Sequence, residues 1–193
     1  MQFRHTLAAV ALGAAITTAP AFAQDVYVLD PDHTIPMYEV THLGFSQQRG
    51  SFTKAAGKVT LDRSARKGAI EVIIQTASVT TGAARLVPNL KAEDFFNVEK
   101  FPTMTYKSAD LVFDGDNVVG ANGELTLLGV TRPVSLTVTG FKCGPHPFNK
   151  KPMCGAEATA TIKRSEFGMK YGIPTATGDD VKIIIPIEAV REG

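Results

Sequence analysis

Apolar and polar side chains alternate with a period of two along most of this chain, and this pattern limits its fold more than any other feature. The alternation places one face of an extended segment in an apolar interior and the other in water, as in antiparallel β-strands. Eight segments show it, over residues 38–42, 58–62, 70–76, 103–108, 124–127, 134–139, 156–163 and 181–188. The sequence therefore predicts an all-β protein.

Turn-forming residues join most of these segments through short links. Asp114-Gly115-Asp116-Asn117 and Leu128-Gly129-Val130 are two such links. Eight antiparallel strands with short links predict a closed up-and-down barrel, which leaves no exposed sheet edge. A two-sheet sandwich is the main alternative. Pro186 cannot donate a ladder hydrogen bond, so we expect it at an edge or a bulge.

Two connections are too long to be simple turns in a compact domain. Within Ser78–Pro102, residues 89–96 predict a short helix between the third and fourth strands, with Asn89 as its N-cap. The second connection, Ser165–Asp180, contains several large apolar residues. We interpret both connections as lids over one mouth of the barrel.

Residues 1–23 have the pattern of a cleavable signal peptide. A basic start precedes an apolar run over residues 7–16, and Ala21-Phe22-Ala23 matches a signal peptidase site. The run is too short for a stable membrane span, which needs about 20 apolar residues. We therefore expect an exported, periplasmic protein in which residues 24–193 form one domain.

The charge balance argues against an anionic partner. The chain has 20 Lys and Arg residues against 19 Asp and Glu residues, and loss of Arg4 with the signal peptide leaves the mature chain neutral. Proteins that bind nucleic acid normally carry a strongly basic face. We therefore exclude nucleic acid as a partner.

The two cysteines, Cys143 and Cys154, flank the loop 144–153. In an oxidising compartment a disulfide between them is favoured over two free thiols. A metal site built from both cysteines and His146 would lack a fourth ligand nearby in the sequence. We predict the disulfide and no metal.

The interior of an eight-stranded barrel is either filled by side chains or holds one small ligand. Ala156, Ala158 and Ala160 share the inward face of one segment and leave space there. Four aromatic residues could fill that space: Phe52, Tyr106, Phe113 and Phe141. The alternation and the side-chain volumes favour neither a filled core nor a cavity over the other. Any cavity would be apolar, so its ligand would be apolar too.

The sequence lacks the motifs of common catalytic sites, including G-x-S-x-G, H-E-x-x-H and the P-loop. His42 shares a strand face with Tyr38 and Val40, and a hydrogen-bonded core histidine is favoured there over a metal ligand. An enzyme would have to rely on His33, His42 and the Ser165–Glu166 pair. We expect neither catalysis nor a cofactor.

A series of short motifs also runs along the chain in a fixed order: Asp30–Thr34, Val40–Ser46, Gly50–Phe52, Ser78–Gly82, Leu90–Asn97, Phe101–Thr103, Gly123–Val134, Arg164–Met169 and Gly178–Val181. In these motifs the chain resembles the YceI-like family of exported, lipocalin-like barrels that bind polyisoprenoids. The resemblance implies an eight-stranded barrel with an isoprenoid chain in an apolar tunnel. Many relatives carry an acidic residue and a histidine where this chain has Val87 and Asn89, which implies a different recognition of the lipid head group.

We therefore expect a periplasmic protein that binds a polyisoprenoid or similar long-chain lipid for transport, storage or supply. Whether it pairs into a homodimer stays open. Ten residues are expected to line the tunnel: Val40, His42, Phe45, Phe52, Leu90, Phe95, Phe96, Tyr106, Ala158 and Phe167. One alternative is a structural or interaction barrel with a filled core, and another is an enzyme acting on a lipid-linked substrate.

Overall fold

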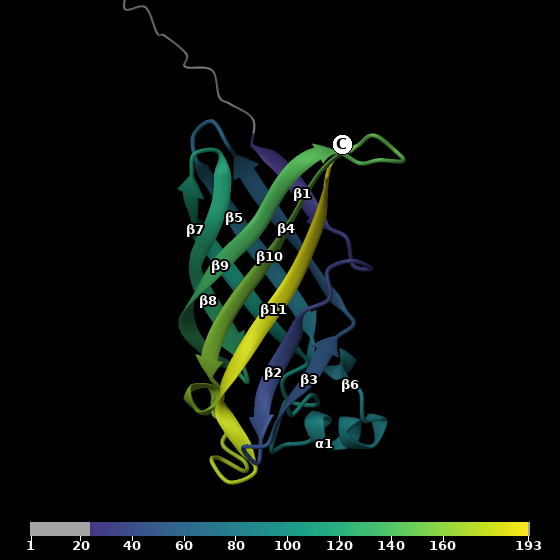
Figure 1. Ribbon diagram of the computed structural model, residues 1–193, viewed down its shortest axis with the longest axis vertical. Coiled ribbons are helices and arrows are strands. Elements are labelled where there is room, and N and C mark those ends of the chain that lie inside the picture. The colour runs from purple at the N-terminus through teal and green to yellow at the C-terminus, as the bar shows by residue number, and fades with distance from the viewer. Residues whose placement is uncertain (1–23, 193) are drawn as a thin grey trace, which may run out of the picture.

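The computed structural model describes residues 24–192, which form one antiparallel sheet rolled into a barrel (Figure 1). The predicted signal peptide, residues 1–23, lies outside the described residues. The strands are β1 (Asp25–Leu29), β2 (Met37–His42), β3 (Ser46–Phe52), β4 (Ala55–Asp62), β5 (Lys67–Gln75), β6 (Val79–Thr81), β7 (Thr103–Asp114), β8 (Asn117–Leu127), β9 (Val130–Pro145), β10 (Pro152–Lys163) and β11 (Thr177–Arg191).

The helical content is small. The α-helix α1 spans Val87–Lys91, and short 3-10 turns cover Thr76–Ser78, Ala84–Leu86 and Arg164–Phe167. Within the described part of the chain, no helix is long and apolar enough to cross a membrane.

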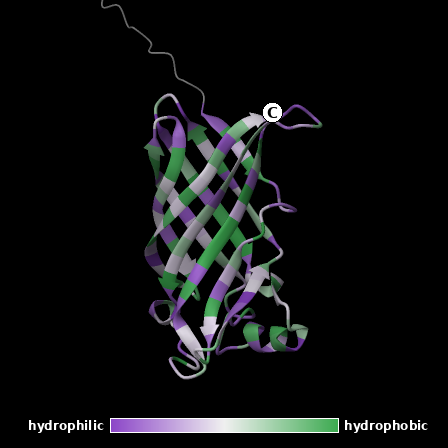
Figure 2. Ribbon diagram, viewed as in Figure 1, coloured by the Kyte–Doolittle hydropathy of each residue, from purple (hydrophilic) through white to green (hydrophobic). Residues whose placement is uncertain are grey.

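The barrel closes through eight strand positions. The hydrogen-bonded order is β1-β4-β5-β7-β8-β9-β10-β11, and β11 pairs with β1 through Ala189 and Leu29 to complete the ring. Three more strands lengthen the wall on one side of the ring: β2 follows on from β1, β3 from β4 and β6 from β5. There β2 pairs with the start of β11, β3 pairs with β2, and β6 pairs with β3. All of these pairings are antiparallel and the single sheet closes on itself. The predicted eight-stranded barrel is therefore confirmed, and the alternative of a two-sheet sandwich is wrong. Figure 2 shows apolar and polar residues alternating along the ribbon.

Three strands and the bounds of the helix differ from the sequence prediction. The eight alternating segments lie in β2, β4, β5 and β7 to β11, whereas β1, β3 and β6 carry too short or too polar a pattern. The helix begins at Val87 and ends at Lys91, with Leu86 as its N-cap. The prediction of Asn89 as N-cap is therefore wrong. Pro88 explains the earlier start, because proline is favoured in the first helical turn.

The barrel wall is interrupted between β1 and β2, where residues 30–36 leave the sheet. Thr34 covers this interruption: its buried hydroxyl donates to the carbonyl of Glu188 and accepts from the amide of Glu188, both at 3.1 Å. Pro186 lies in the same stretch of β11, which pairs with β10 but with neither β1 nor β2. Pro186 therefore lies where β11 has a paired strand on one side only, as expected for a residue without an N–H group.

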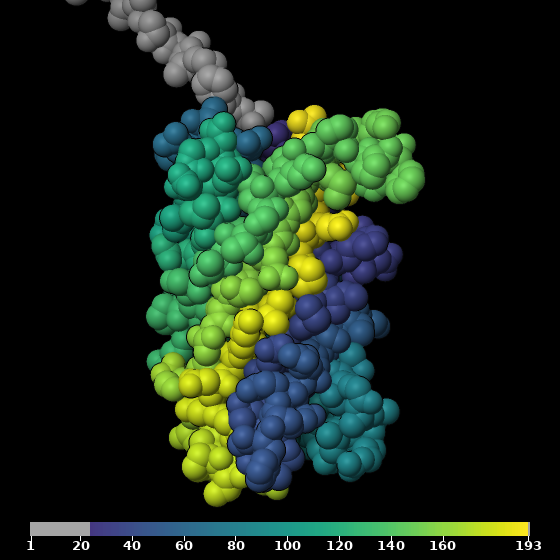
Figure 3. All heavy atoms as spheres, viewed as in Figure 1, coloured from purple at the N-terminus to yellow at the C-terminus, as the bar shows by residue number. Residues whose placement is uncertain are grey.

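One end of the barrel is a solid core. Its buried side chains come from the ends of the strands near the β4–β5 and β7–β8 turns: Tyr27, Leu61, Leu111, Val118, Ala121, Cys154 and Ala189. The β9–β10 hairpin protrudes from this end of the barrel (Figure 3). We call this end the closed end. The helix α1 lies at the opposite end, which we call the lid end (Figure 1).

The predicted disulfide between Cys143 and Cys154 is confirmed. The two residues face each other across β9 and β10 with Cα atoms 4.1 Å apart, so the bond cross-links paired strands at the base of the protruding hairpin.

We expect replacement of both cysteines by serine to lower the free energy of unfolding by about 2–3 kcal/mol, because the bond restricts the unfolded chain. Urea denaturation of the two proteins measures the difference. An unchanged midpoint would show that the paired strands alone hold the hairpin. Lys150→Ser, in the exposed loop of the same hairpin, is the control and should leave the midpoint unchanged.

Candidate functional site

An apolar cavity of about 390 Å³ occupies the barrel from its middle to the lid end. Aliphatic side chains of four strands form a large part of its wall: Val59, Ile70, Val72, Leu136, Val138, Ile183, Ile185 and Ile187. Its volume lies within the range of roughly 300–1,000 Å³ typical of small-molecule sites. The solid core blocks the closed end, so the cavity is a blind tunnel. No Asp or Glu of the described residues lines it.

Three aromatic rings form one wall of the tunnel. The rings of Phe52 and Phe96 meet edge to face with centroids 5.1 Å apart, and Tyr38 lies about as close to both, at 6.1 and 6.2 Å. Burial raises the pKa of the Tyr38 hydroxyl to about 12, so this group is neutral at physiological pH. The wall is therefore uncharged.

Glycines in neighbouring strands allow two large tyrosines to lie against the barrel wall. A Cβ atom at Gly50 would overlap the ring of Tyr38, its register partner on β2. A Cβ at Gly123 would lie 2.6 Å from the hydroxyl of Tyr106, which donates to the carbonyls of Ala121 and Val134. Because both rings lie over a glycine, the centre of the barrel stays open.

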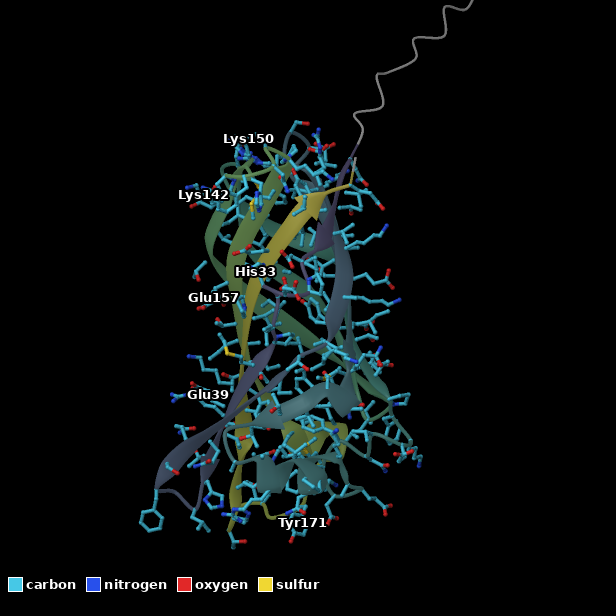
Figure 4. All side chains as sticks on the ribbon, turned by 90° about the vertical axis from the view of Figure 1, so that its right-hand side faces the viewer. His33, Glu39, Lys142, Lys150, Glu157 and Tyr171 are labelled. Carbon is cyan, nitrogen blue, oxygen red and sulfur yellow. A yellow bond between two sulfur atoms is a disulfide. The ribbon has the colours of Figure 1, made fainter. Side chains whose placement is uncertain are left out.

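Both long connections reach the mouth of the tunnel, as the sequence predicted. Leu90 and Phe95 of the first connection line the cavity, and so does Tyr171 of the second. The rings of Phe95 and Tyr171 meet with centroids 5.6 Å apart, which joins the two lids. Tyr171 is labelled at the lid end in Figure 4.

Arg164 fastens the second lid from within. Its buried guanidinium donates five hydrogen bonds, to the carbonyls of Met169, Tyr171, Thr177 and Gly178 and to the hydroxyl of Thr177. Burial lowers the pKa of the guanidinium, but an arginine remains protonated at any physiological pH. Arg164 also lines the cavity, but its guanidinium donates its hydrogen bonds to the lid, so its role is to hold the lid.

Most of the polar side chains that line the cavity gather at the lid end. His42, Gln48 and Asn89 are all exposed there. Arg49 also lines this end and forms an ion pair with Glu39. A ligand with a polar head can therefore leave that head at the mouth, where water and these side chains solvate it.

Eight of the ten residues predicted from the sequence line the cavity: Val40, His42, Phe52, Leu90, Phe95, Phe96, Tyr106 and Ala158. Phe45 does not, because it lies at the exposed tip of the β2–β3 turn, where the alternation of β2 no longer applies. Phe167 is buried but does not line the cavity, because it belongs to a 3-10 turn and packs in the core. These two placements were wrong.

The residues that leave space in the barrel are not the ones that the sequence indicated. Of the three inward alanines of β10, only Ala158 lines the cavity, while Ala156 and Ala160 pack against the core. Phe113 and Phe141 also pack against the core without lining the cavity. The aliphatic wall of β5 and β11, which the sequence reasoning did not single out, is visible as plain alternation in both strands.

The side chains considered for catalysis are held apart. His33 lies outside the cavity on the flank of the barrel (Figure 4), where its Nδ1 is 2.8 Å from Asp30 and 3.9 Å from Glu188. His42 lies at the mouth, and Ser165 donates to the carboxylate of Asp179 at 2.8 Å. In residues 24–192, Asp30, His33 and Glu188 are the one group of three that could hold a metal ion, and all three are partly or fully exposed.

We expect His33 to titrate above its ordinary pKa, since the hydrogen bond to Asp30 raises it. The pair therefore stabilises the fold while Asp30 is ionised and His33 is protonated. This contribution is lost as the pH rises through the raised folded pKa of His33, and also as the pH falls through the lowered folded pKa of Asp30. NMR titration of the His33 ring measures this value. Asp30→Asn should bring it back towards the ordinary value, and an unchanged titration would show that the pair does not persist in solution.

The fold and the cavity together define a lipocalin-like β-barrel: a closed antiparallel barrel with one blind, apolar, lidded interior. Residues 27–189 match the YceI-like domain, and the chain belongs to this family. It is 35% identical to a UPF0312 protein of Pseudomonas aeruginosa strain LESB58 over 195 residues, which covers 99% of this chain and 100% of that protein.

Solved structures show the same barrel. BcnA of Burkholderia cenocepacia has a TM-score of 0.70 and 21% identity, over 83% of this chain and 98% of that chain. A polyisoprenoid-binding domain from Saccharophagus degradans has a TM-score of 0.63 and 14% identity, over 86% of this chain and 98% of that one. At these identities the likeness shows the fold alone.

Proposed function

We propose that this protein binds a polyisoprenoid or similar long-chain lipid, with the apolar chain in the tunnel and the polar head at the mouth. The observation that carries the proposal is the blind apolar tunnel, walled by aliphatic and aromatic side chains with no acidic residue. Transfer of a hydrocarbon chain from water into such a cavity is favourable by about 0.8 kcal/mol per CH₂ group. The name of the Saccharophagus degradans domain supports an isoprenoid as the chain.

The proposal extends to a carrier in the periplasm. The signal-like residues 1–23 and the disulfide between Cys143 and Cys154 both fit export to an oxidising compartment. A protein that encloses the chain while its two lids meet over the mouth is suited to transport, storage or supply of that lipid. Binding and release are the whole activity in this proposal, with no chemical step.

Native mass spectrometry of protein purified from the periplasm tests the proposal. We expect a mass above that of the chain, and identification of a long-chain isoprenoid lipid in the organic extract. Protein stripped of lipid should then take up a long polyprenol, and a short sugar of similar mass should not bind. A ligand-free mass together with no uptake of polyprenol would overturn the proposal.

A further inference from the structure

The most exposed of the large apolar side chains lie mainly around the mouth of the tunnel. Among the described residues, four such side chains are more than half exposed: Leu43 at 52%, Phe45 at 92%, Phe148 at 90% and Tyr171 at 56%. Phe148 lies in the β9–β10 hairpin at the closed end. The other three lie at the lid end, and we call Leu43, Phe45 and Tyr171 the mouth rim.

The mouth rim is held together by the two segments that carry it. Leu43 and Gly44 have positive φ angles of 51° and 74°, which form the tight turn that presents Phe45 to solvent. The amide of Leu43 donates to the carbonyl of Ala176 at 2.9 Å, so this turn rests on the second lid. Tyr171 of that lid both lines the tunnel and is exposed outside it. Tyr171 therefore connects the exposed rim to the tunnel wall.

The charge of the rim segments identifies the surface that they suit. Residues 42–48 contain no Asp, Glu, Lys or Arg, and residues 168–177 contain Lys170 as their one charged side chain. Apolar segments with a single charged side chain suit the surface of a bilayer, where aromatic rings sit at the headgroup level.

We propose that the mouth rim docks on a lipid bilayer, so that a chain can pass between the bilayer and the tunnel without crossing water. This inference rests on the proposed function, because it needs a lipid ligand to give the docking a purpose. The docking is reversible: three side chains enter the headgroup region, and the described residues contain no membrane-spanning helix.

Flotation with vesicles of phosphatidylethanolamine and a minor share of phosphatidylglycerol tests the docking. We expect the mature protein to float with the vesicles. Phe45→Ser should weaken the apparent affinity by about tenfold, and the double variant Leu43→Asn with Phe45→Ser should weaken it further, since each change removes apolar surface from the rim. Asparagine tolerates the positive φ of position 43, so the turn is retained.

Phe148→Ser is the matched control, because Phe148 is as exposed as Phe45 but lies at the closed end. It should float like the unchanged protein. The inference is overturned if the unchanged protein stays with the free fraction, if Phe45→Ser floats equally well, or if Phe148→Ser loses binding instead. Lipid content measured by mass spectrometry on the same preparations reports separately on the proposed function, since a filled tunnel does not require docking.

Discussion

Replacing Val72 by tryptophan is expected to prevent a long chain from filling the tunnel while the barrel stays folded. Val72 lies in the middle of the tunnel wall on β5, between Ile70 and Ile74, which also line it. Its register partner on β4 is Gly57, which has no side chain to occupy the neighbouring space. An indole ring at this position therefore extends into the cavity and takes up volume that the ligand would fill.

The expected loss of affinity follows from the length of chain that is excluded. Each buried carbon contributes about 0.8 kcal/mol, so exclusion of one five-carbon isoprene unit removes about 4 kcal/mol and weakens binding by up to about a thousandfold. Titration of stripped protein with a polyprenol, followed by native mass spectrometry, measures this loss. Unfolding in urea should change little, because the ring replaces an empty space with apolar contacts.

Ile73→Trp is the control for Val72→Trp. Ile73 is the next residue of β5, and it is exposed on the outside of the barrel because successive side chains of a strand point to opposite faces. It should bind polyprenol like the unchanged protein. Equal binding by Val72→Trp would show that the chain does not extend beyond the mouth.

The barrel could be predicted from the sequence because each strand shows its own inside and outside. In β11, Val181, Ile183, Ile185 and Ile187 all line the tunnel, and their alternation is visible without any other strand. The strand β3 could not be found in this way. Its residues from Ser46 to Arg49 are exposed at the mouth, where both faces of the strand meet water and the alternation disappears.

The open interior could not be predicted from the alternation, because it depends on pairs of residues far apart in the sequence. The ring of Tyr38 lies against the wall only because Gly50 is its partner on β3, and Tyr106 lies over Gly123 in the same way. A period of two places these tyrosines inside but does not say whether they point across the barrel or along its wall. The resemblance to the family, rather than the pattern, therefore favoured a tunnel.

Arg164→Met is expected to loosen the second lid and to shorten the time for which a lipid is retained. The change removes all five hydrogen bonds of the guanidinium and leaves the carbonyls of Met169, Tyr171 and Gly178 without this donor. Since an unsatisfied buried carbonyl is costly, we expect the free energy of unfolding to fall by about 2–4 kcal/mol. Urea denaturation measures this change, and transfer of polyprenol to vesicles measures retention.

Two further variants separate the hydrogen bonds from the charge and from the general effect of losing an arginine. Arg164→Lys keeps the charge but has three donors on one atom in place of a planar fork, so its loss should be intermediate. Arg132→Met removes an exposed arginine whose one hydrogen bond, to the carbonyl of Glu166, is long at 3.4 Å. It should change the free energy of unfolding by no more than about 0.5 kcal/mol.

Hydrogen exchange shows where the loss of Arg164 acts. The amides of Leu43 and Ala176 are bonded to the carbonyls of Ala176 and Gly172, so they should exchange faster once the lid is released. Amides in the middle of β8 and β9 should keep their protection relative to global unfolding. A uniform loss of protection would instead show that Arg164 stabilises the whole barrel and not the lid alone. Faster exchange confined to the lid, with faster lipid transfer, would identify Arg164 as the residue that keeps the tunnel closed.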